Sequence, residues 1–505
     1  MNPRKPFLWK VAYLVAIGAL LMPLFMLSQP ATSGVPGGEQ AGRPGGWLAR
    51  LREKHHLSQT QLGQIDPTSE TIKLATLGMR GVAADILWTK ANDYQKKKDW
   101  TNLSATLEQI TKLQPHFIAV WRHQAWNLSY NVSVAFDDYH EKYQWVIRGI
   151  EFLKEGVANN DKEPRLLWDL GWFIAQKIGR ADEHKLYRRL FKADDDFQGS
   201  RAGEERDNWL VGKSYFRQAE ELANLGVPVK GMGLLIFYSD APMCQMNYAE
   251  ALEKEGRFDE VASRAWKQAS TDWYDFGQRD IPTSWGVTIH LNDQEVHDAA
   301  AKKDLDALEK LQPGLHVKIA AEKRKTLTPA QLKAVDTPLE KRTPKQLELA
   351  SKAEPLLQVS HEEVARRITG HSRDAALALA RSAANHEQLA TYGRRERQTV
   401  NFDYWRLRAQ VEQDPDAIAA RKAIYQGEQA YEHGELLPAK AAYDRGLAGW
   451  HKVLDRYPGL KTDETHTMVS DLMDTIKDYR KLLEKLDEPL PKPFILQDVI
   501  DIKKQ

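Results

Sequence analysis

Only a few residues in this chain have types and spacing that suggest chemistry. Asp194, Asp195 and Asp196 stand together in a charged stretch and offer the carboxylate oxygens that hard divalent cations prefer. The ligand spacing of a calcium-binding loop is missing around them. We therefore expect residues 192–208 to form a solvated surface loop.

The histidines do not form a recognisable metal or protease motif. His290 and His297 are seven residues apart and have no further ligands at metal-site spacing. The stretch His361–Val364 lacks the second histidine of a zinc-protease helix. His55 and His56 stand on a polar segment, where we expect solvated side chains.

One glycine-rich stretch, 226–242, interrupts the helical pattern. Gly231 and Gly233 precede an apolar run, Leu234–Tyr238, which resembles a strand. A phosphate-binding loop would follow the apolar run and continue into Gly-Lys-Ser/Thr, so nucleotide binding is not indicated. We expect an inserted irregular loop, which is also where a small ligand would be sought.

The composition excludes several classes of protein. With 71 basic and 70 acidic residues among 505, the charges nearly cancel, and no basic surface for nucleic acid is indicated. The single cysteine, Cys244, excludes a disulfide framework, a covalent haem motif and a cysteine-rich zinc site. The sequence assigns no catalytic, cofactor-binding or metal-binding residue. Its fifteen tryptophans suggest helix packing or, alternatively, an aromatic groove.

The elements of the chain are predicted to be helical hairpins. Residues 78–115 contain two amphipathic helices around a polar break and end in a proline. Apolar, small and aromatic side chains recur here at the positions that a 34-residue helical repeat requires. In that register the residues are Leu87, Ala91, Tyr94, Leu107, Ile110 and Pro115.

The same register returns along the chain. The small residue lets two helices approach closely, and its large neighbours fill the groove between them. The recurring positions are Trp121 and Ala125; Leu167, Gly171 and Tyr187; Gly256, Ala262 and Trp266; and Gly427, Gly434, Ala439 and Tyr443.

These motifs resemble the tetratricopeptide repeat (TPR), and the chain resembles a bacterial membrane-anchored TPR protein. The resemblance implies an all-α, degenerate TPR-like helical-hairpin solenoid with irregular insertions. It also implies that the first helix of each hairpin lines a concave face that holds an extended peptide or a partner helix. The helices bearing Ala91, Ala125, Gly171 and Ala249 would form that face. Which residues touch a partner is not readable from the sequence.

The N-terminal end predicts a membrane anchor. Residues 7–27 are apolar except for Lys10, near the roughly 20 residues that a spanning helix needs. Basic residues before and at its start predict a cytoplasmic N-terminus, 1–6, and a body on the extracytoplasmic side. The alternative is a signal peptide cleaved near Ala31–Ser33. Residues 28–46, rich in Gly and Pro, predict a flexible linker.

Three further regions are expected after the linker. Residues 47–285 carry the TPR-like repeats with the inserted loop 226–242. Residues 286–400 form a charged helical region whose helices begin at Thr-Pro pairs. Residues 401–505 contain a last TPR-like hairpin, a capping helix and a Pro-rich tail.

Three hypotheses for function remain open at this point. The first is a non-catalytic, membrane-tethered TPR scaffold that binds protein partners of unknown identity in the bacterial cell envelope. The second is an exported helical-solenoid enzyme acting on cell-wall glycan, which would need paired carboxyl groups beside exposed tryptophans. The third is a ligand sensor that uses the loop 226–242. No cofactor and no nucleic-acid partner is expected.

Overall fold

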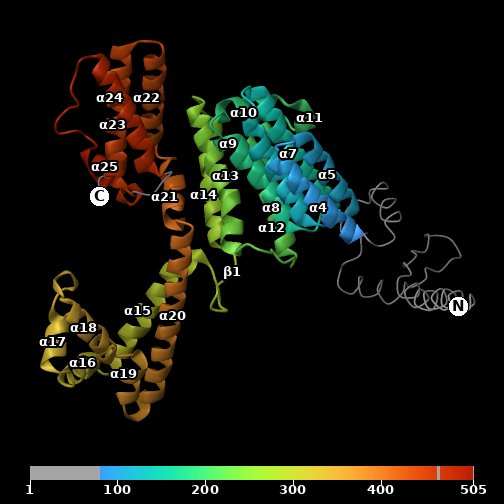
Figure 1. Cartoon of the computed structure of the whole chain (residues 1–505). Helices are drawn as coiled ribbons and strands as arrows, with labels where there is room; N and C mark the ends of the chain where they lie inside the picture. Colours follow the sequence, from blue (N-terminus) through green and yellow to red (C-terminus); the bar gives the residue numbers. More distant parts are fainter. Residues whose placement is uncertain (1–79, 463–466, 504–505) are drawn as a thin grey trace, which may run out of the picture. The chain divides into compact units, whose positions relative to one another are not determined.

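The computed structural model describes residues 80–462 and 467–503 and divides the chain into two compact units, 1–232 and 233–505 (Figure 1). Helices dominate both units, and a hairpin of two-residue strands is the only sheet in the described part. The all-α prediction is therefore confirmed. The predicted anchor 7–27 and linker 28–46 lie outside the described residues, and no helix within 80–462 or 467–503 is long and apolar enough to cross a membrane.

The first unit is a succession of antiparallel helices joined by short turns (Figure 1). Its elements are α4 (Arg80–Lys96), α5 (Trp100–Leu113), α6 (Ile118–Trp126), η2 (Asn127–Val132), η3 (Ser133–Ala135), α7 (Tyr139–Asn159), α8 (Pro164–Trp172), η4 (Phe173–Lys177), α9 (Ile178–Arg180), α10 (His184–Ala193), α11 (Asp195–Gln198), η5 (Gly203–Arg206) and α12 (Asn208–Asn224).

Aspartates begin four of these helices, including α11, which Asp194 caps. The carboxylates of Asp99, Asp138 and Asp207 accept hydrogen bonds from backbone N–H groups in the first turns of α5, α7 and α12. Each such cap stabilises a helix by about 1 kcal/mol because the first N–H groups have no partner inside the helix.

Small residues let the helices of the first unit approach closely. A methyl group added at Gly171 of α8 would lie 2.9 Å from the carbonyl oxygen of Gly212 in α12. One added at Gly156 of α7 would lie 2.8 Å from the Trp121 ring of α6. The indole N–H of Trp121 in turn donates to the Pro115 carbonyl over 2.8 Å. Gly171, Trp121 and Pro115 were all singled out by repeat spacing.

The second unit contains longer helices. Its elements are α13 (Leu234–Lys254), α14 (Glu260–Gly277), β1 (Ile281–Pro282), β2 (Thr288–Ile289), η6 (Leu291–Asp293), α15 (Gln294–Leu311), α16 (Leu315–Lys325), α17 (Pro329–Asp336), η7 (Leu339–Lys341), α18 (Pro344–Leu357), α19 (His361–Arg367), η8 (Gly370–Ser372), α20 (Arg373–Thr399), α21 (Phe402–Val411), α22 (Pro415–Glu432), α23 (Leu436–Arg456), η9 (Pro458–Leu460), α24 (Met468–Lys485) and α25 (Gln497–Ile502).

One prediction in this unit is wrong. The irregular loop expected over 226–242 ends at Gly233, and the strand-like run Leu234–Tyr238 forms the first turns of α13. Pro242 lies inside that helix. An apolar run of five residues does not distinguish a strand from a buried helix turn, and here helix packing decided the outcome. Gly226 and Gly231, with φ of +87° and +70°, form the remaining turn.

The predicted Thr-Pro helix starts are confirmed. Thr328 and Thr343 each cap a helix, α17 and α18, whose first residue is proline. In both, the threonine hydroxyl accepts a hydrogen bond from the backbone N–H of the glutamine three residues later. The side-chain oxygen of that glutamine accepts one from the threonine N–H. The Ser360 side chain likewise accepts from the Glu363 N–H at the start of α19.

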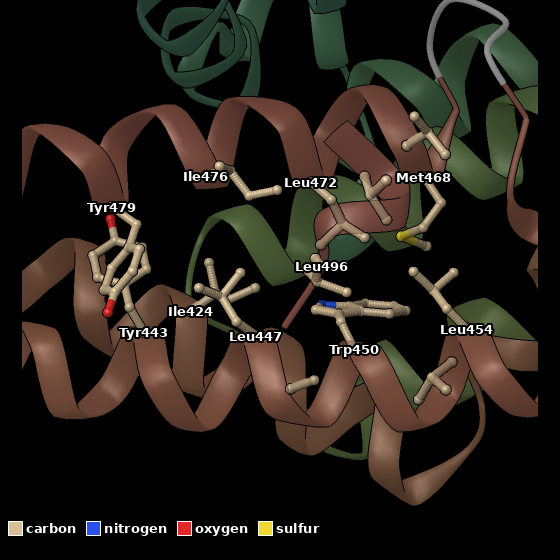
Figure 2. Packing of buried hydrophobic residues seen from close by; sticks show 14 of the residues in the cluster. Ile424, Tyr443, Leu447, Trp450, Leu454, Met468, Leu472, Ile476, Tyr479 and Leu496 are labelled. Carbon is tan, nitrogen blue, oxygen red and sulfur yellow. The ribbon is translucent and has the colours of Figure 1, made fainter. Parts of the chain in front are cut away.

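The C-terminal hairpin α22–α23 packs with α24 around a core of large side chains (Figure 2). Trp450 lies at its centre and is fully buried, and the rings of Tyr443 and Tyr479 pack 5.9 Å apart. Gly427 in α22 accommodates the Tyr443 ring, which a methyl group there would approach to 3.0 Å. The chain beyond Glu488, predicted as a Pro-rich tail, ends in α25, whose Val499 and Ile500 are buried in this core.

Candidate functional site

The charged groups first considered for chemistry have structural partners. Asp194 caps α11 and accepts a hydrogen bond from the Tyr143 hydroxyl, while Asp195 pairs with Arg206. The His290 ring bridges two carboxylates, Asp280 and Asp293, at 2.8 and 2.9 Å, and these interactions raise its pKa. Among the described residues, no group of His, Cys, Asp and Glu is arranged to hold a metal ion.

The repeat-signature residues lie mainly between helices. Buried examples are Ala91, Pro115, Trp121, Ala125, Leu167, Gly171, Tyr187, Ala262, Trp266, Gly427, Ala439 and Tyr443. Leu87, Tyr94 and Gly256 are partly buried, and Gly434 is exposed. Their positions indicate packing and turn formation rather than contact with a partner.

Two π-helical segments distinguish the first unit. The helix that starts as α6 continues as η2, and the helix that starts as α8 continues as η4. A π-helix inserts an extra residue into the helical repeat, shifts the side chains that follow it, and is frequent at functional sites. Here the two segments lie on neighbouring helices, and their side chains meet.

Aromatic side chains gather where η2 and η4 meet, and we call them the aromatic ledge. We define the ledge as the side chains of Trp126 in α6, Tyr130 in η2, Trp172 in α8 and Phe173 in η4. The rings of Trp126 and Tyr130 stack 4.1 Å apart with only 13° between their planes, and Trp172 lies 6.3 Å from Trp126 and 6.1 Å from Tyr130. Phe173 packs edge-on beneath them and is buried.

The ledge is open to solvent at the ring of Trp126. Trp126 is 45% exposed although it is one of the largest apolar side chains. Tyr130 and Trp172 are partly exposed. Tryptophan and tyrosine are enriched at the centres of protein interfaces because they bury a large area with few rotatable bonds.

A lysine borders the ledge on its inner side. The Lys177 ammonium lies 4.5 Å from the centre of the Tyr130 ring, within cation–π distance. Burial lowers the pKa of Lys177, and the carboxylates of Glu183 and Asp182 oppose that shift. The aromatic faces therefore carry a positive charge beside them, which favours a partner with an acidic or carbonyl group near its apolar side chains.

Aromatic contacts extend from the ledge region to α4. Trp88 of α4 packs on His123 of α6, with ring centres 5.4 Å apart, and on Phe117, which is 43% exposed. Three consecutive first helices, α4, α6 and α8, thus present aromatic side chains.

A second feature of the first unit is a groove between α5 and α7. It has a volume of about 880 Å³, and its floor includes Trp121 and Phe152. Three glutamates, Glu108, Glu151 and Glu155, line it. Burial and the other two glutamates raise the pKa of Glu155. This groove lies on second helices, in contrast to the ledge.

The second unit contains a largely buried ion cluster. We define it as Glu250 and Glu253 of α13, Arg408 of α21, Glu412 directly after α21, Arg421 of α22 and Asp471 of α24. Arg408 lies 2.8 Å from Asp471, 3.4 Å from Glu250 and 3.5 Å from Glu412. Arg421 lies 2.5 Å from Glu412 and 3.6 Å from Glu253. Four helices are joined by these charges.

The cluster holds four carboxylates and two guanidinium groups, so its acids compete for cations. Burial raises the pKa of Glu253 to about 8, with a further contribution from Glu412 that Arg421 opposes. Burial also raises the pKa of Asp471. For Glu250, burial acts in the same direction, but Arg408 and Lys254 outweigh it and lower the pKa. A buried acid with a raised pKa marks either an ion-pair network or a functional site.

A cavity of about 200 Å³ adjoins the cluster. Trp450 and Glu253 line it, and each has a buried polar atom without a hydrogen-bond partner in the protein: the indole Nε1 and the carboxylate Oε2. Leaving such a group unpaired costs roughly 1–3 kcal/mol. The other oxygen of Glu253 accepts from the Trp266 indole N–H over 3.0 Å.

Sequence spacing found neither the ledge nor the cluster. The ledge residues follow the signature positions Trp121, Ala125 and Gly171 by one to five residues, but Tyr130 and Phe173 lie in π-helical segments, which the repeat register does not predict. The cluster draws on residues 250 to 471, and acids and arginines are too frequent for a pattern to select these six. No protein-family model matches the chain, and no curated protein is similar to it.

Proposed function

We propose that this protein is a non-catalytic, membrane-tethered TPR-like scaffold that binds a segment of a partner protein on the aromatic ledge. The partner segment would be extended and would carry aromatic or long apolar side chains. The anchor 7–27 would hold the body on the extracytoplasmic side of a bacterial membrane, and the linker 28–46 would give it reach.

The exposed stack of Trp126, Tyr130 and Trp172 carries this proposal. Apolar rings of this size are normally buried, and their exposure leaves favourable burial energy unused in the isolated chain. A truncated ring at the centre of an interface commonly costs 2 kcal/mol or more in binding.

The buried packing of the repeat-signature residues supports the TPR-like part of the proposal. These positions pack helices closely against one another, as Gly171 does for α8 and α12. The side chains facing away from that packing on α6 and α8 are then available for a partner, which is the role that the TPR resemblance implies for first helices.

The alternative, an exported enzyme acting on cell-wall glycan, would rest on the buried acids of the second unit. Glu253 has the raised pKa that a general acid needs. However, its tryptophan neighbours Trp266 and Trp450 are buried within the helices, and neither offers an exposed face to a sugar ring. The structure therefore provides no specific support for this alternative.

A crosslinking pull-down from membranes tests the proposal. The full-length protein would be compared with Trp126→Ala/Trp172→Ala and with a groove variant on α7, Glu151→Ala/Glu155→Ala. We expect the native protein and the groove variant to recover the same defined set of envelope proteins, and the ledge variant to recover at least tenfold less.

The outcomes separate the possible binding surfaces. Loss only in the groove variant would move binding from the ledge to the α5–α7 groove. Recovery of no protein by the native chain would contradict the scaffold, and a screen for glycan hydrolysis would follow. Unchanged recovery by both variants would exclude both surfaces of the first unit.

A further inference from the structure

Two of the most exposed apolar side chains of the second unit lie beyond the end of the α15–α20 hairpin. Helices α16 to α19 pack together at this end (Figure 1). Val317 of α16 is 70% exposed, and Leu339 of η7 is 67% exposed. Single exposed apolar side chains are normal on a protein surface, so the charges around these two decide what they indicate.

One side of α16 is buried, and the other faces solvent. Leu315 and Ile319 pack into the core of this region. Each residue turns an α-helix by about 100°, so Val317, two residues from both, lies on the opposite side. Lys318 and Lys325 are also exposed on this outer side of the helix.

Side-chain contacts bring the end of α16, η7 and the start of α18 to one corner. The Arg324 guanidinium of α16 lies 2.7 Å from the Asp336 carboxylate at the end of α17. The hydroxyl of Thr337, the next residue, accepts from the Gln346 amide of α18 over 3.2 Å. The Thr337 carbonyl accepts from Nε of Arg342, which directly follows η7, over 2.8 Å.

Val317 belongs to the same corner. It precedes Arg324 by two helical turns, which is about 10 Å along the axis, and it lies on the same side of α16. Leu339 follows Asp336 by three residues. The two exposed apolar side chains are therefore connected through the contact between Arg324 and Asp336.

Positive charge is in excess at this corner. The carboxylate of Asp336 is already paired with Arg324, and Glu322 is paired with Arg367. Glu340 is exposed and has no such partner in the described part of the chain. Five exposed lysines form no salt bridge and no side-chain hydrogen bond with any other described residue: Lys318, Lys325, Lys333, Lys341 and Lys345. We call these five lysines, with Val317 and Leu339, the lysine corner.

We propose that the lysine corner docks on an anionic lipid surface. The ammonium groups lie among the lipid phosphates, and the side chains of Val317 and Leu339 enter the boundary between headgroups and acyl chains. Lysine suits this place because its aliphatic stem packs along apolar surface while its charge stays in water. Each lysine near such a surface strengthens binding by about fivefold at physiological salt.

A lipid surface fits the corner better than a nucleic acid or an acidic protein segment. Proteins that bind single-stranded nucleic acid stack bases on aromatic side chains, whereas the apolar side chains of this corner are aliphatic. A bound peptide commonly occupies a groove or a sheet edge, and the groove and the cavity described above include no residue of this corner.

A fluorescent label at position 339 tests the proposal in the full-length protein. The native Cys244 is 2% exposed, so an environment-sensitive NBD group attached to the Leu339→Cys variant reports this position. The protein is held in phosphatidylcholine nanodiscs and mixed with separate vesicles of phosphatidylcholine, with or without phosphatidylglycerol. We expect a blue shift and at least a twofold gain in emission with the anionic vesicles only. The gain should fall as salt is added.

Matched variants of the labelled protein locate the surface. Lys341→Gln/Lys345→Gln should raise the concentration of anionic vesicles needed for half of the response at least tenfold. Lys302→Gln/Lys303→Gln removes two exposed lysines from the middle of α15 and should leave that concentration unchanged. A label placed instead on Val317→Cys should respond over the same range of vesicle concentration.

The proposal is overturned if neither kind of vesicle changes the emission, or if both change it equally. It is also overturned if the two lysine pairs have equal effects, or if only one of the two labels responds. A response to poly-L-glutamate without a response to vesicles would assign the corner to an acidic protein segment instead. The comparison of vesicles does not depend on the folding of the lysine variants. A failed partner pull-down would leave this result intact, because the lysine corner and the aromatic ledge belong to different units.

Discussion

The aromatic ledge of the first unit and the ion cluster of the second place their side chains in opposite ways. The first unit brings aromatic rings to its surface, where Trp126 and its neighbours form the ledge. The second unit buries charged groups, where Arg408 is 2% exposed among Glu250, Glu412 and Asp471. Exposed rings leave binding energy available to a partner, whereas buried charges constrain the helices that carry them.

The comparison shows that hydrophobicity alone does not decide what lies inside. Trp121 and Trp126 are five residues apart on one helix, yet the first is 3% exposed and the second 45%. Arg408 is buried, and Arg421 is only 16% exposed, because four carboxylates surround them, which offsets the cost of removing their charges from water.

Arg408→Met should have the largest effect on stability. It removes three ion pairs and leaves Glu250, Glu412 and Asp471 sharing only the remaining cations. Breaking one side of a buried ion pair costs about 3–5 kcal/mol, so thermal unfolding followed by circular dichroism should show a clear decrease in melting temperature. Arg264→Met, at an exposed pair with Glu260, is the control and should change little. Equal effects of the two would contradict the view that the cluster joins the helices.

Gly171→Ala should have the next largest effect and tests the close packing of the first unit. The added methyl group would meet the Gly212 carbonyl oxygen at 2.9 Å and the Phe216 ring at 3.1 Å, so α8 and α12 must separate. We expect a loss of about 1–3 kcal/mol in the free energy of unfolding, measured by denaturant titration. Gly81→Ala, whose nearest neighbour is the Gln114 side chain at 3.7 Å, should cause no loss.

Glu253→Gln should change how the stability of the second unit depends on pH. The folded carboxyl has a pKa of about 8 against an ordinary value of 4.5, so between these values the unfolded chain is ionised and the folded one stays protonated. The native protein therefore loses stability as pH rises from 4.5 to 8, by up to about 1.4 kcal/mol per pH unit from this group. The neutral variant lacks this loss. The native protein and the variant should have similar melting temperatures near pH 5, and the variant should have the higher one at pH 8. A difference that does not change with pH would contradict the raised pKa of Glu253.

Trp126→Ala should have the smallest effect on stability. Its ring is 45% exposed and contributes mainly its stacking on Tyr130 and Trp172, which is worth about 1 kcal/mol. We expect a small change in melting temperature together with a large loss of partner recovery. A strong destabilisation would mean that the ring serves folding and not binding. Trp121→Ala, at the buried position of the same helix, provides the contrast, with an expected cost of about 3–5 kcal/mol.

Local chemistry made some elements predictable. Thr328 and Thr343 precede prolines, and a hydroxyl before proline specifies a helix start without help from distant residues. The small residues Ala91, Gly171 and Gly427 were recognisable because close helix contacts require them at a regular spacing. The run Leu234–Tyr238 was predicted incorrectly because short apolar segments suit a strand and a buried helix equally well.

The sequence by itself determined the all-α class, several helix starts and the small residues at which neighbouring helices touch. Each of these depends on interactions within a few residues or on a regular period. Five residues turn a regular helix by about 140°, so Trp121 and Trp126 lie on different faces of α6, and tertiary packing decided which of these faces is buried. It also brought residues from 250 to 471 into one ion cluster, since only folding can place side chains so distant along the chain within hydrogen-bonding distance.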